Sequence, residues 1–514
     1  MKACCVGQPG TDALGRSETF ALCSLRRPWF RGFHASWLSF FLAFVGWFAL
    51  VPAMQYLVES EENDIDDQAR KLSDVLSVLG TVLIRLVFGE VVERWGPRRP
   101  QTVLLGYGAV LVLASSQINS ATSLYVTRFL ISLVGAAFIP CQFWTTMLFS
   151  EKVVGRANAF AGGWGNLGGG LTILFMANLI AQFRTVYDDE VAWRYAMIVP
   201  GILMLVACIP LWLFTDDCPQ GLWEKRVYGR ELQAREKPSD LRPKRGWALL
   251  EWTAPYCDWR VWILFIQYAC CFGVELTFNN AMTSYLYQSF TIDEVVGEVD
   301  CTATGSHNST TGQFFPECSI LGKDTSAMVA SLFGLQNLYA RALGGVASDF
   351  AFKRYSLRGR LVVQFVVLFL EGIAIIVFSQ LKSLPSAILC MVLLSILVQM
   401  AEGSTYSLTP FVRSNIGTVI GIVGAGGNIG AVSWATLLRY VEESNRAFLL
   451  IGIAVVSSSF LTLALNLQGQ SIIYSLKKGD TQSVYGDEAS KDSDSSASFT
   501  TRDTNPIPGS LVRT

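Results

Sequence analysis

The stretch RLVFGEVVE occupies residues 85–93, and the similar stretch RALGGVASD occupies residues 341–349. In both, an arginine is followed after four positions by a glycine and after eight positions by an acidic residue. Each stretch lies at the end of an apolar segment, and the first runs directly into the basic stretch RWGPRR at 94–99. The recurrence indicates a chain made of two duplicated halves, in which Arg85 and Arg341 hold equivalent positions.

The composition points to a membrane protein. Of the 514 residues, 51% are hydrophobic and 16% are charged, whereas a soluble domain carries about 25% charged residues. The apolar residues form blocks of about 20, the length that a helix needs to cross a bilayer core. Because lipid offers the backbone no hydrogen-bond partners, each block must be helical. We expect an all-α membrane protein with 12 transmembrane helices, near residues 35–57, 73–93, 101–118, 123–148, 154–181, 195–214, 260–287, 326–349, 360–381, 384–407, 414–438 and 447–467.

A basic central stretch divides these segments into two groups, which predicts two pseudo-symmetric six-helix halves. The last residues are rich in Ser, Thr, Asp and Lys and nearly lack large apolar side chains, a composition typical of disorder. The expected organisation is an N-terminal segment at 1–33, a first half at 34–214, a central loop at 215–259, a second half at 260–467 and a disordered tail at 468–514.

The distribution of Lys and Arg predicts the orientation, because cytoplasmic loops carry an excess of them. The cations gather in the loops of one side, including the run from Lys225 to Arg245, while the first loop of the other side is acidic. We expect both termini in the cytoplasm and the protein in the plasma membrane. An internal membrane such as that of the vacuole is the alternative.

The longest loop of the outer side, 291–325, carries two features of an extracellular segment. Asn308 begins an Asn-Ser-Thr glycosylation acceptor, although an acceptor that is never used is an equally good interpretation. Cys301 and Cys318 bracket this site. In an oxidising compartment they predict a disulfide.

The two repeated arginines predict a binding site for an anion. Each lies eight residues from the acid at the inner end of its helix, which places it about 12 Å into a core of about 30 Å. A cation at that depth costs at least about 2.5–3.5 kcal/mol. Either a local carboxylate or helix end neutralises each arginine, or the pair binds an anion. No acid lies one turn away on the same helix toward the cavity, which favours the anion.

The choice of arginine indicates the shape of that anion. A guanidinium binds a planar oxyanion through two parallel hydrogen bonds, and nitrate is a flat, weakly hydrated monoanion. Arg128, a third arginine in an apolar segment, lies near an outer helix end. We interpret it as reaching out to the membrane surface.

Two glycine-rich runs, AGGWGNLGGG at 161–170 and GAGGNIG at 424–430, share the pattern Gly-Asn-x-Gly. Helix packing alone explains the glycines. It does not explain an Asn at the same place in both runs, because a buried amide needs partners. We expect Asn166 and Asn428 to contact the substrate or the opposite half. We expect the two helices to slide on six glycines: Gly162, Gly165, Gly168, Gly424, Gly427 and Gly430.

These runs resemble the paired nitrate signatures of the nitrate/nitrite porter family in the major facilitator superfamily. The Gly-x-x-x-acid motif likewise resembles the inner-loop signature of that superfamily. The resemblance covers about residues 34–467 and is strongest to the eukaryotic high-affinity branch. It implies two parallel halves, and nitrate held between Arg85 and Arg341 with Asn166 donating a hydrogen bond.

The resemblance also implies an aromatic clamp on the anion. Tyr268 and Phe272, one turn apart on the seventh helix, match the family's pair. Phe138 on the fourth helix and Phe48 on the first are further candidates. For these two, packing in the core or against lipid is the alternative.

Two acids inside apolar segments, Glu275 and Glu402, are candidate proton carriers, since an intramembrane carboxylate is functional by default. Either could instead neutralise an arginine permanently. The eukaryotic resemblance implies proton symport of nitrate, and possible nitrite transport; nitrate/nitrite exchange, another small anion, and a nitrate sensor that signals through its tail remain alternatives.

The other expected partners are the lipid bilayer and an accessory membrane protein. We expect no enzyme activity, cofactor, metal site or nucleic-acid partner, since the sequence has no nucleophile–base set, no Walker motif and no metal-ligand spacing around His34 or His307.

Overall fold

A computed structural model describes residues 10–59, 65–226, 253–292, 295–296, 299–301, 316–441 and 443–473. The predicted glycosylation acceptor Asn308 and the predicted disordered tail beyond residue 473 lie outside these ranges. Most of the predicted central loop, residues 227–252, lies outside them as well.

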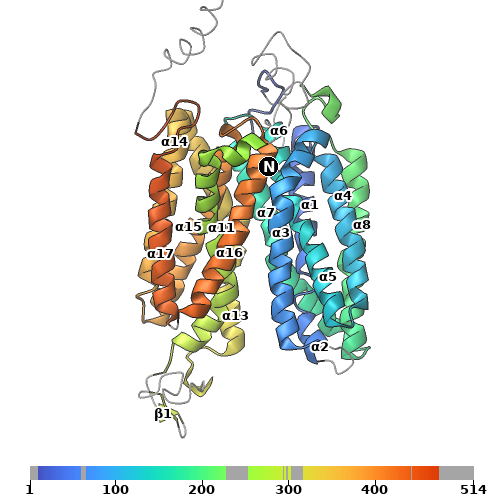
Figure 1. The fold of residues 1–514 in the computed structure, drawn as a ribbon, viewed down its shortest axis with the longest axis vertical. Helices are drawn as coiled ribbons and strands as arrows, with labels where there is room; N and C mark the ends of the chain where they lie inside the picture. Colours follow the sequence, from blue (N-terminus) through green and yellow to red (C-terminus); the bar gives the residue numbers. More distant parts are fainter. Residues whose placement is uncertain are drawn as a thin grey trace, which may run out of the picture.

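The described residues form two bundles of helices that stand side by side (Figure 1). The first bundle contains α1 (Trp29–Phe48), α2 (Met54–Glu59), α3 (Asp67–Trp95), α4 (Arg98–Ala114), α5 (Ala121–Ser132), α6 (Phe138–Leu148), α7 (Val154–Phe183) and α8 (Asp189–Phe214). The second contains α11 (Trp259–Ser289), α13 (Lys323–Leu335), α14 (Ala340–Phe378), α15 (Leu384–Leu408), α16 (Ile416–Tyr440) and α17 (Ser444–Phe460). The short strands β1 (Val295–Val296) and β2 (Val299–Asp300) form a hairpin after α11.

All 12 predicted segments overlap helices of the structure. Within the described residues, 9 continuous helical stretches are long and apolar enough to cross a membrane. One of them, Thr325–Phe378, contains two predicted segments that meet at a kink, where Ser356 has a φ of 55°. Helices α1 and α4, with 20 and 17 residues, complete the bundle. The all-α fold with two halves is therefore as predicted.

Three predicted helices are interrupted, which the apolar pattern alone did not reveal. The first ends at Phe48 and resumes as α2, since Pro52 cannot continue the hydrogen-bond ladder between them. The fourth breaks into α5 and α6 around a 3₁₀ turn at Leu133–Ala137, and Pro140 lies in the first turn of α6, where proline is tolerated. The eighth breaks into α13 and α14 around a 3₁₀ turn at Gln336–Leu338.

Both ends of the described chain lie at one end of the bundle, which we call the terminal end. Near the N-terminus, the Ser17 N–H donates to the Leu148 carbonyl at the end of α6 (2.9 Å). Near the C-terminus, the Gln470 side chain contacts the backbone N–H of Arg358 beside the kink of α14 (3.4 Å). This placement agrees with an even number of membrane crossings.

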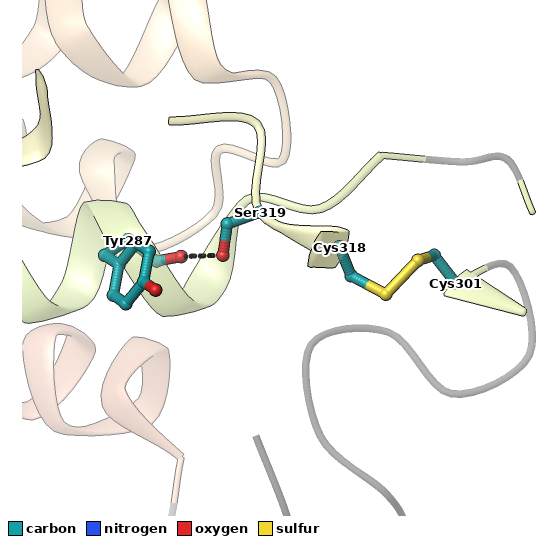
Figure 2. The surroundings of a disulfide bond; sticks show 4 residues. All are labelled: Tyr287, Cys301, Cys318 and Ser319. Carbon is teal, nitrogen blue, oxygen red and sulfur yellow. Dashed lines mark hydrogen bonds between the residues drawn. A yellow bond between two sulfur atoms is a disulfide. The ribbon is translucent and has the colours of Figure 1, made fainter. Parts of the chain in front are cut away.

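The opposite end, which we call the loop end, carries the predicted disulfide. Cys301 and Cys318 are joined, with their Cα atoms 5.5 Å apart (Figure 2). Next to it, the Ser319 hydroxyl donates to the Tyr287 carbonyl near the end of α11 (2.6 Å; Figure 2). The Ile292 N–H also donates to the Cys318 carbonyl (2.8 Å). The bridged segment is thus fastened to α11.

At the terminal end, the acids of the repeated motif join the two halves. The buried Asp349 carboxylate on α14 accepts hydrogen bonds from the backbone N–H groups of Gly155 (3.0 Å) and Arg156 (2.9 Å) at the start of α7. The Glu93 carboxylate on α3 accepts from the Thr418 N–H (3.0 Å) at the start of α16. Each acid therefore caps a helix N-terminus of the opposite half, where negative charge is stabilising.

The halves meet most closely beside these caps. A Cβ at Gly89 would lie 2.3 Å from the Gly417 carbonyl oxygen, and a Cβ at Gly345 would lie 2.4 Å from the Gly155 carbonyl oxygen. The contact does not extend to the loop end: α16 is buried throughout 416–428, but none of residues 431–440 is buried. The structure is therefore closed between the halves at the terminal end.

The Asp349→Asn variant should loosen this closure. The substitution removes a charge that holds the N-terminus of α7 together with the Arg156 and Arg360 guanidiniums (both 2.9 Å). Hydrogen bonds to charged groups contribute about 1.5–3 kcal/mol, so we expect the open population at the terminal end to rise about ten-fold or more. Thiol labelling of a Thr418→Cys reporter, in a background with the exposed Cys23 and Cys257 replaced by Ser, measures it.

The matched control is Asp189→Asn, which removes the same charge from an exposed surface pair with Arg184. Its labelling rate should equal that of the unsubstituted protein. Equal rates for Asp349→Asn and the control would show that Asp349 does not hold the halves together.

Candidate anion site between the halves

Arg85 is buried where α3 meets α6 and α16, with 1% of its surface exposed. Its Nε and Nη2 donate to the Gly135 carbonyl (3.1 and 3.0 Å), which the break of the fourth helix leaves available. Its Nη1 donates to the Gly424 carbonyl of α16 in the other half (2.8 Å). Within the described residues, its hydrogen bonds go to carbonyls, so its positive charge is solvated by dipoles and not cancelled.

Arg341 is equally buried, at the second residue of α14, but it has a carboxylate beside it. Its Nη2 donates to the Tyr268 hydroxyl (2.7 Å), and its Nη1 lies 2.8 Å from Oε2 of Glu402. The Nη1 N–H groups are not aligned with that oxygen, so the contact is an ion pair without a proper hydrogen bond. The prediction of two uncompensated arginines is therefore wrong for Arg341, because Glu402 approaches from α15, a different helix.

Glu402 belongs to a pair of acids. The Glu275 carboxyl on α11 faces it within reach of a shared proton, and neither oxygen of Glu402 has a well-aligned partner. The Asn337 amide, in the 3₁₀ turn before α14, donates to the Glu275 Oε1. Both carboxyls are at most 3% exposed. The structure thus brings the two predicted proton carriers together, next to one of the two arginines.

Aromatic rings line the space around the arginines. The Cζ atoms of Arg85 and Arg341 lie 5.4 and 5.9 Å from the centroid of the same ring, that of Phe138. The Phe138 and Tyr268 rings are nearly parallel, with centroids 6.4 Å apart and planes at 19°. Phe272 stacks on the far side of Tyr268, at 5.3 Å and 8°. Phe138 therefore lies beside the predicted pair, and its ring, which is also part of the buried core, lies near both guanidiniums.

Phe48 does not join this group. Its ring packs against Phe44 and Trp47, and a Cβ at Gly169 on α7 would lie 3.2 Å from it. The aromatic residue of α1 that reaches the site is Phe40, whose ring centroid lies 5.5 Å from that of Phe138. The alternative of core packing thus describes Phe48 better than the clamp does.

The six glycines divide into two kinds. A Cβ at Gly162 would lie 3.2 Å from Nε of Arg341, and a Cβ at Gly424 would lie 3.7 Å from Cδ of Arg85. Gly162 therefore lets the arginine of the opposite half approach closely, whereas Gly424 lies at ordinary contact distance from Arg85. The other four pack within their own half: Gly165 against Phe40, Gly168 against the Phe41 carbonyl, Gly427 against Tyr268 and Phe272, and Gly430 against the Ala269 carbonyl. A sliding role for those four does not follow from these contacts.

Asn166 and Asn428 hold equivalent places, one helical turn beyond Gly162 and Gly424. They are 9% and 2% exposed, and neither side-chain Nδ2 has a hydrogen-bond partner within the described residues. Buried donors of this kind are normally satisfied. Two unsatisfied amide donors near two guanidiniums make the region suited to an anion that accepts hydrogen bonds.

Besides Phe40, two further components of the site were not predicted from the sequence. Tyr406 packs edge-on against both Phe138 and Tyr268, with centroids 4.7 and 4.9 Å apart. It lies one turn after Glu402 on α15, a spacing that would have found it. The start of α14 also lies at the site, because the break before Arg341 directs a helix N-terminus there. The polar residue Asn337, inside an apolar segment, was a sign of that break.

Arg128 is buried and pairs with Asp74 of α3, so it does not reach the membrane surface as predicted. Among the residues that the structure describes, no group of His, Cys, Asp and Glu side chains is arranged to hold a metal ion.

Comparison with known proteins gives the family. A model of the Major Facilitator Superfamily matches residues 36–435. The chain is 34% identical to high affinity nitrate transporter 2.5 of Arabidopsis thaliana over 424 residues, which cover 82% of this chain and 76% of the relative. It is 27% identical to the nitrate/nitrite transporter NrtP of Picosynechococcus sp., over 80% of this chain and 85% of that one. The chain belongs to the nitrate/nitrite porter family of the major facilitator superfamily.

A solved structure supports the fold of this porter. The E. coli fucose:proton symporter FucP resembles it with a TM-score of 0.57 at 13% identity, over 85% of this chain and 98% of that one. At that identity the similarity concerns the fold alone. The family and fold predicted from the sequence are thereby confirmed.

The glycine contacts of the porter predict a difference between two neighbouring substitutions. A Cβ at Gly165 would lie 1.8 Å from the Phe40 ring, whereas a Cβ at Gly170, on the same helix, would meet nothing within 4 Å. Overpacking costs about 1–3 kcal/mol, so Gly165→Ala should lower the melting temperature of the purified porter by several degrees. Gly170→Ala should leave it unchanged, and equal melting temperatures would contradict the packing described here.

Proposed function

We propose that this porter is a secondary active transporter that carries nitrate, and also nitrite, by alternating access coupled to proton symport. The main support is the pair of buried guanidiniums over one aromatic ring, of which one is balanced only by carbonyl dipoles. The nitrate transporters to which the chain is similar add independent support.

The charges around the site give a physical route to coupling. With Glu275 and Glu402 both ionised, the two arginines are balanced and the site has no net attraction for an anion. One proton shared by the two carboxyls leaves a net charge of plus one, which a single nitrate neutralises. In a region of low dielectric this difference is large. Proton binding therefore creates the anion site, and loss of the proton expels the anion.

The same proton changes the geometry of Arg341. While Glu402 is ionised, its carboxylate competes with the substrate for Nη1. Once Glu402 is neutral, Nη1 can turn its free N–H groups to nitrate, while Nη2 keeps its bond to the Tyr268 hydroxyl. The N-terminus of α14 adds a partial positive charge at this point, as in other carriers with interrupted helices.

The aromatic rings account for a preference for flat anions. A planar anion between two rings needs roughly 7 Å, twice the contact distance of about 3.5 Å. The Phe138 and Tyr268 centroids are 6.4 Å apart and the rings nearly parallel, so a small separation of the halves opens such a slot. The amides of Asn166 and Asn428 would then donate to the oxygens of the anion.

In this proposal the described conformation is the one closed toward the cytoplasm. The terminal end, with its two acid caps, faces the cytoplasm, and the disulfide at the loop end faces outside. The plasma membrane is the proposed location, and an accessory membrane protein is a proposed partner. The terminal end opens when the caps of Asp349 and Glu93 release α7 and α16.

Labelled nitrate uptake into vesicles, with and without a pH gradient, tests the substrate and the coupling together. We expect accumulation only when the gradient is present. Arg341→Ala should abolish uptake, and Arg85→Lys should raise the KM strongly, because an ammonium cannot form two parallel hydrogen bonds to nitrate. Accumulation driven by nitrite inside, and not by protons, would show that the carrier is an exchanger.

Glu402→Gln should separate binding from coupling. The amide imitates the protonated acid, so the site stays positive at every pH. We expect nitrate–nitrate exchange to continue with a KM that depends less steeply on pH, while proton-driven accumulation is reduced. Glu317→Gln, an exposed acid of the loop end, is the control and should change neither. Loss of exchange as well as accumulation would mean that Glu402 only holds Arg341 in place.

A further inference from the structure

A third intramembrane carboxyl has no role in the mechanism above. Glu371 lies on α14 in the middle of the segment between the Ser356 kink and Phe378. It is fully buried, and within the described residues neither carboxyl oxygen has a hydrogen-bond partner. An ionised carboxylate in such surroundings costs several kcal/mol, so Glu371 holds a proton in this conformation.

The groups that face Glu371 contain no cation to stabilise its charged form. From α11 they are the thiols of Cys270 and Cys271, and from α15 the carboxyl of Glu402. From α17, Val456 packs against the neighbouring Gly372. Glu371 and Glu402 are two buried carboxyls on the packed helices α14 and α15. Repulsion between like charges opposes the simultaneous ionisation of both.

A chain of buried polar side chains begins about 10 Å from Glu371 along α14, on the side of the terminal end. Gln364 lies two turns from Glu371 on the same face of α14. Its Nε2 donates to the Thr405 hydroxyl (2.9 Å) and to Oε1 of Gln267 (3.2 Å), and its Oε1 accepts from the Ser404 hydroxyl. Gln267 continues to the Thr462 hydroxyl (2.7 Å), after α17. All of these side chains are 0% exposed.

The face of α14 that carries Gln364 also carries a residue at the contact between the halves at the terminal end. Arg360 lies eleven residues before Glu371, a spacing that returns to the same helix face. Its Nη2 donates to the Asp349 carboxylate (2.9 Å) that caps α7. Opening of the terminal end therefore changes the surroundings of the helix segment that carries Gln364 and Glu371.

Building on the proton coupling proposed above, we infer that Glu371 is a second proton-binding site of the transport cycle, whose proton leaves through the buried polar chain inside the C-terminal half. Nitrate and this proton then follow different routes: the anion passes between the halves, and the proton passes within one of them. In the conformation closed at the terminal end Glu371 is protonated. Opening of that end admits water to the chain and allows the proton to leave.

The first test asks whether Glu371 is protonated, and it does not require transport. Infrared spectra of the purified carrier should show the carbonyl band of a buried, protonated carboxyl. This band should be lost in Glu371→Gln and kept in the control Glu317→Gln. Persistence of the full band in Glu371→Gln would overturn the inference.

The second test measures how many protons move with each nitrate ion. In vesicles with a set membrane potential, the ratio of protons to nitrate should fall by one in Glu371→Gln, and the pH dependence of the KM should become shallower by one proton. Glu371→Asp, which keeps a titratable group, should restore the wild-type ratio. Gln364→Leu should slow proton-driven uptake and leave nitrate–nitrate exchange unchanged.

An unchanged ratio in Glu371→Gln, with normal coupling in the wild type, would refute this inference alone. Nitrate transport by the wild type without any proton movement would refute the proposed coupling itself. Normal proton-driven uptake by Gln364→Leu would exclude the polar chain as the route.

Discussion

Burying a positive charge inside a membrane is costly, and the arrangement of this carrier around Arg85 and Arg341 follows from that cost. Both guanidiniums are 1% exposed, yet they are compensated in different ways. Arg85 is held by carbonyl dipoles from the broken fourth helix and from α16. Arg341 is held by the Tyr268 hydroxyl and the Glu402 carboxylate. Because a titratable carboxyl lies beside Arg341 and none pairs with Arg85 among the described residues, the net charge of the site depends on a proton. A permanently ionised carboxylate beside each arginine would remove that dependence.

Each half of the duplicated chain contributes residues that contact the other half. The acid of each repeated motif caps a helix of the other half, and Gly162 makes room for the arginine of the other half. The motif that reveals the repeat in the sequence is therefore also what joins the repeats in space. Because the arginine and the acid of each motif lie on one helix, two turns apart, the closure at the terminal end and the anion site are mechanically connected.

Features that depend on one helix could be predicted from the sequence, whereas contacts between two helices could not. The repeat predicted equivalent places for Arg85 and Arg341, and each of the 12 apolar blocks overlaps helical structure. The pairing of Arg341 with Glu402 joins α14 to α15, so no search along one helix could find it. Phe40 reaches the site and Phe48, two turns further along the same aromatic-rich helix, does not, and only packing distinguishes them. The helix breaks at 133–137 and 336–338 occur inside apolar segments, where hydropathy carries no signal.

The bridged cysteines at the loop end offer an attachment point on one half. Cys318 and Ser319 are hydrogen-bonded to the last turn of α11 and the residues just after it (Figure 2), so these two residues move with the C-terminal bundle. A fluorophore or an antibody fragment fixed there would follow the movement of that bundle. It would do so without touching the path of the anion, and a second label on the α7–α8 turn would supply the stationary reference.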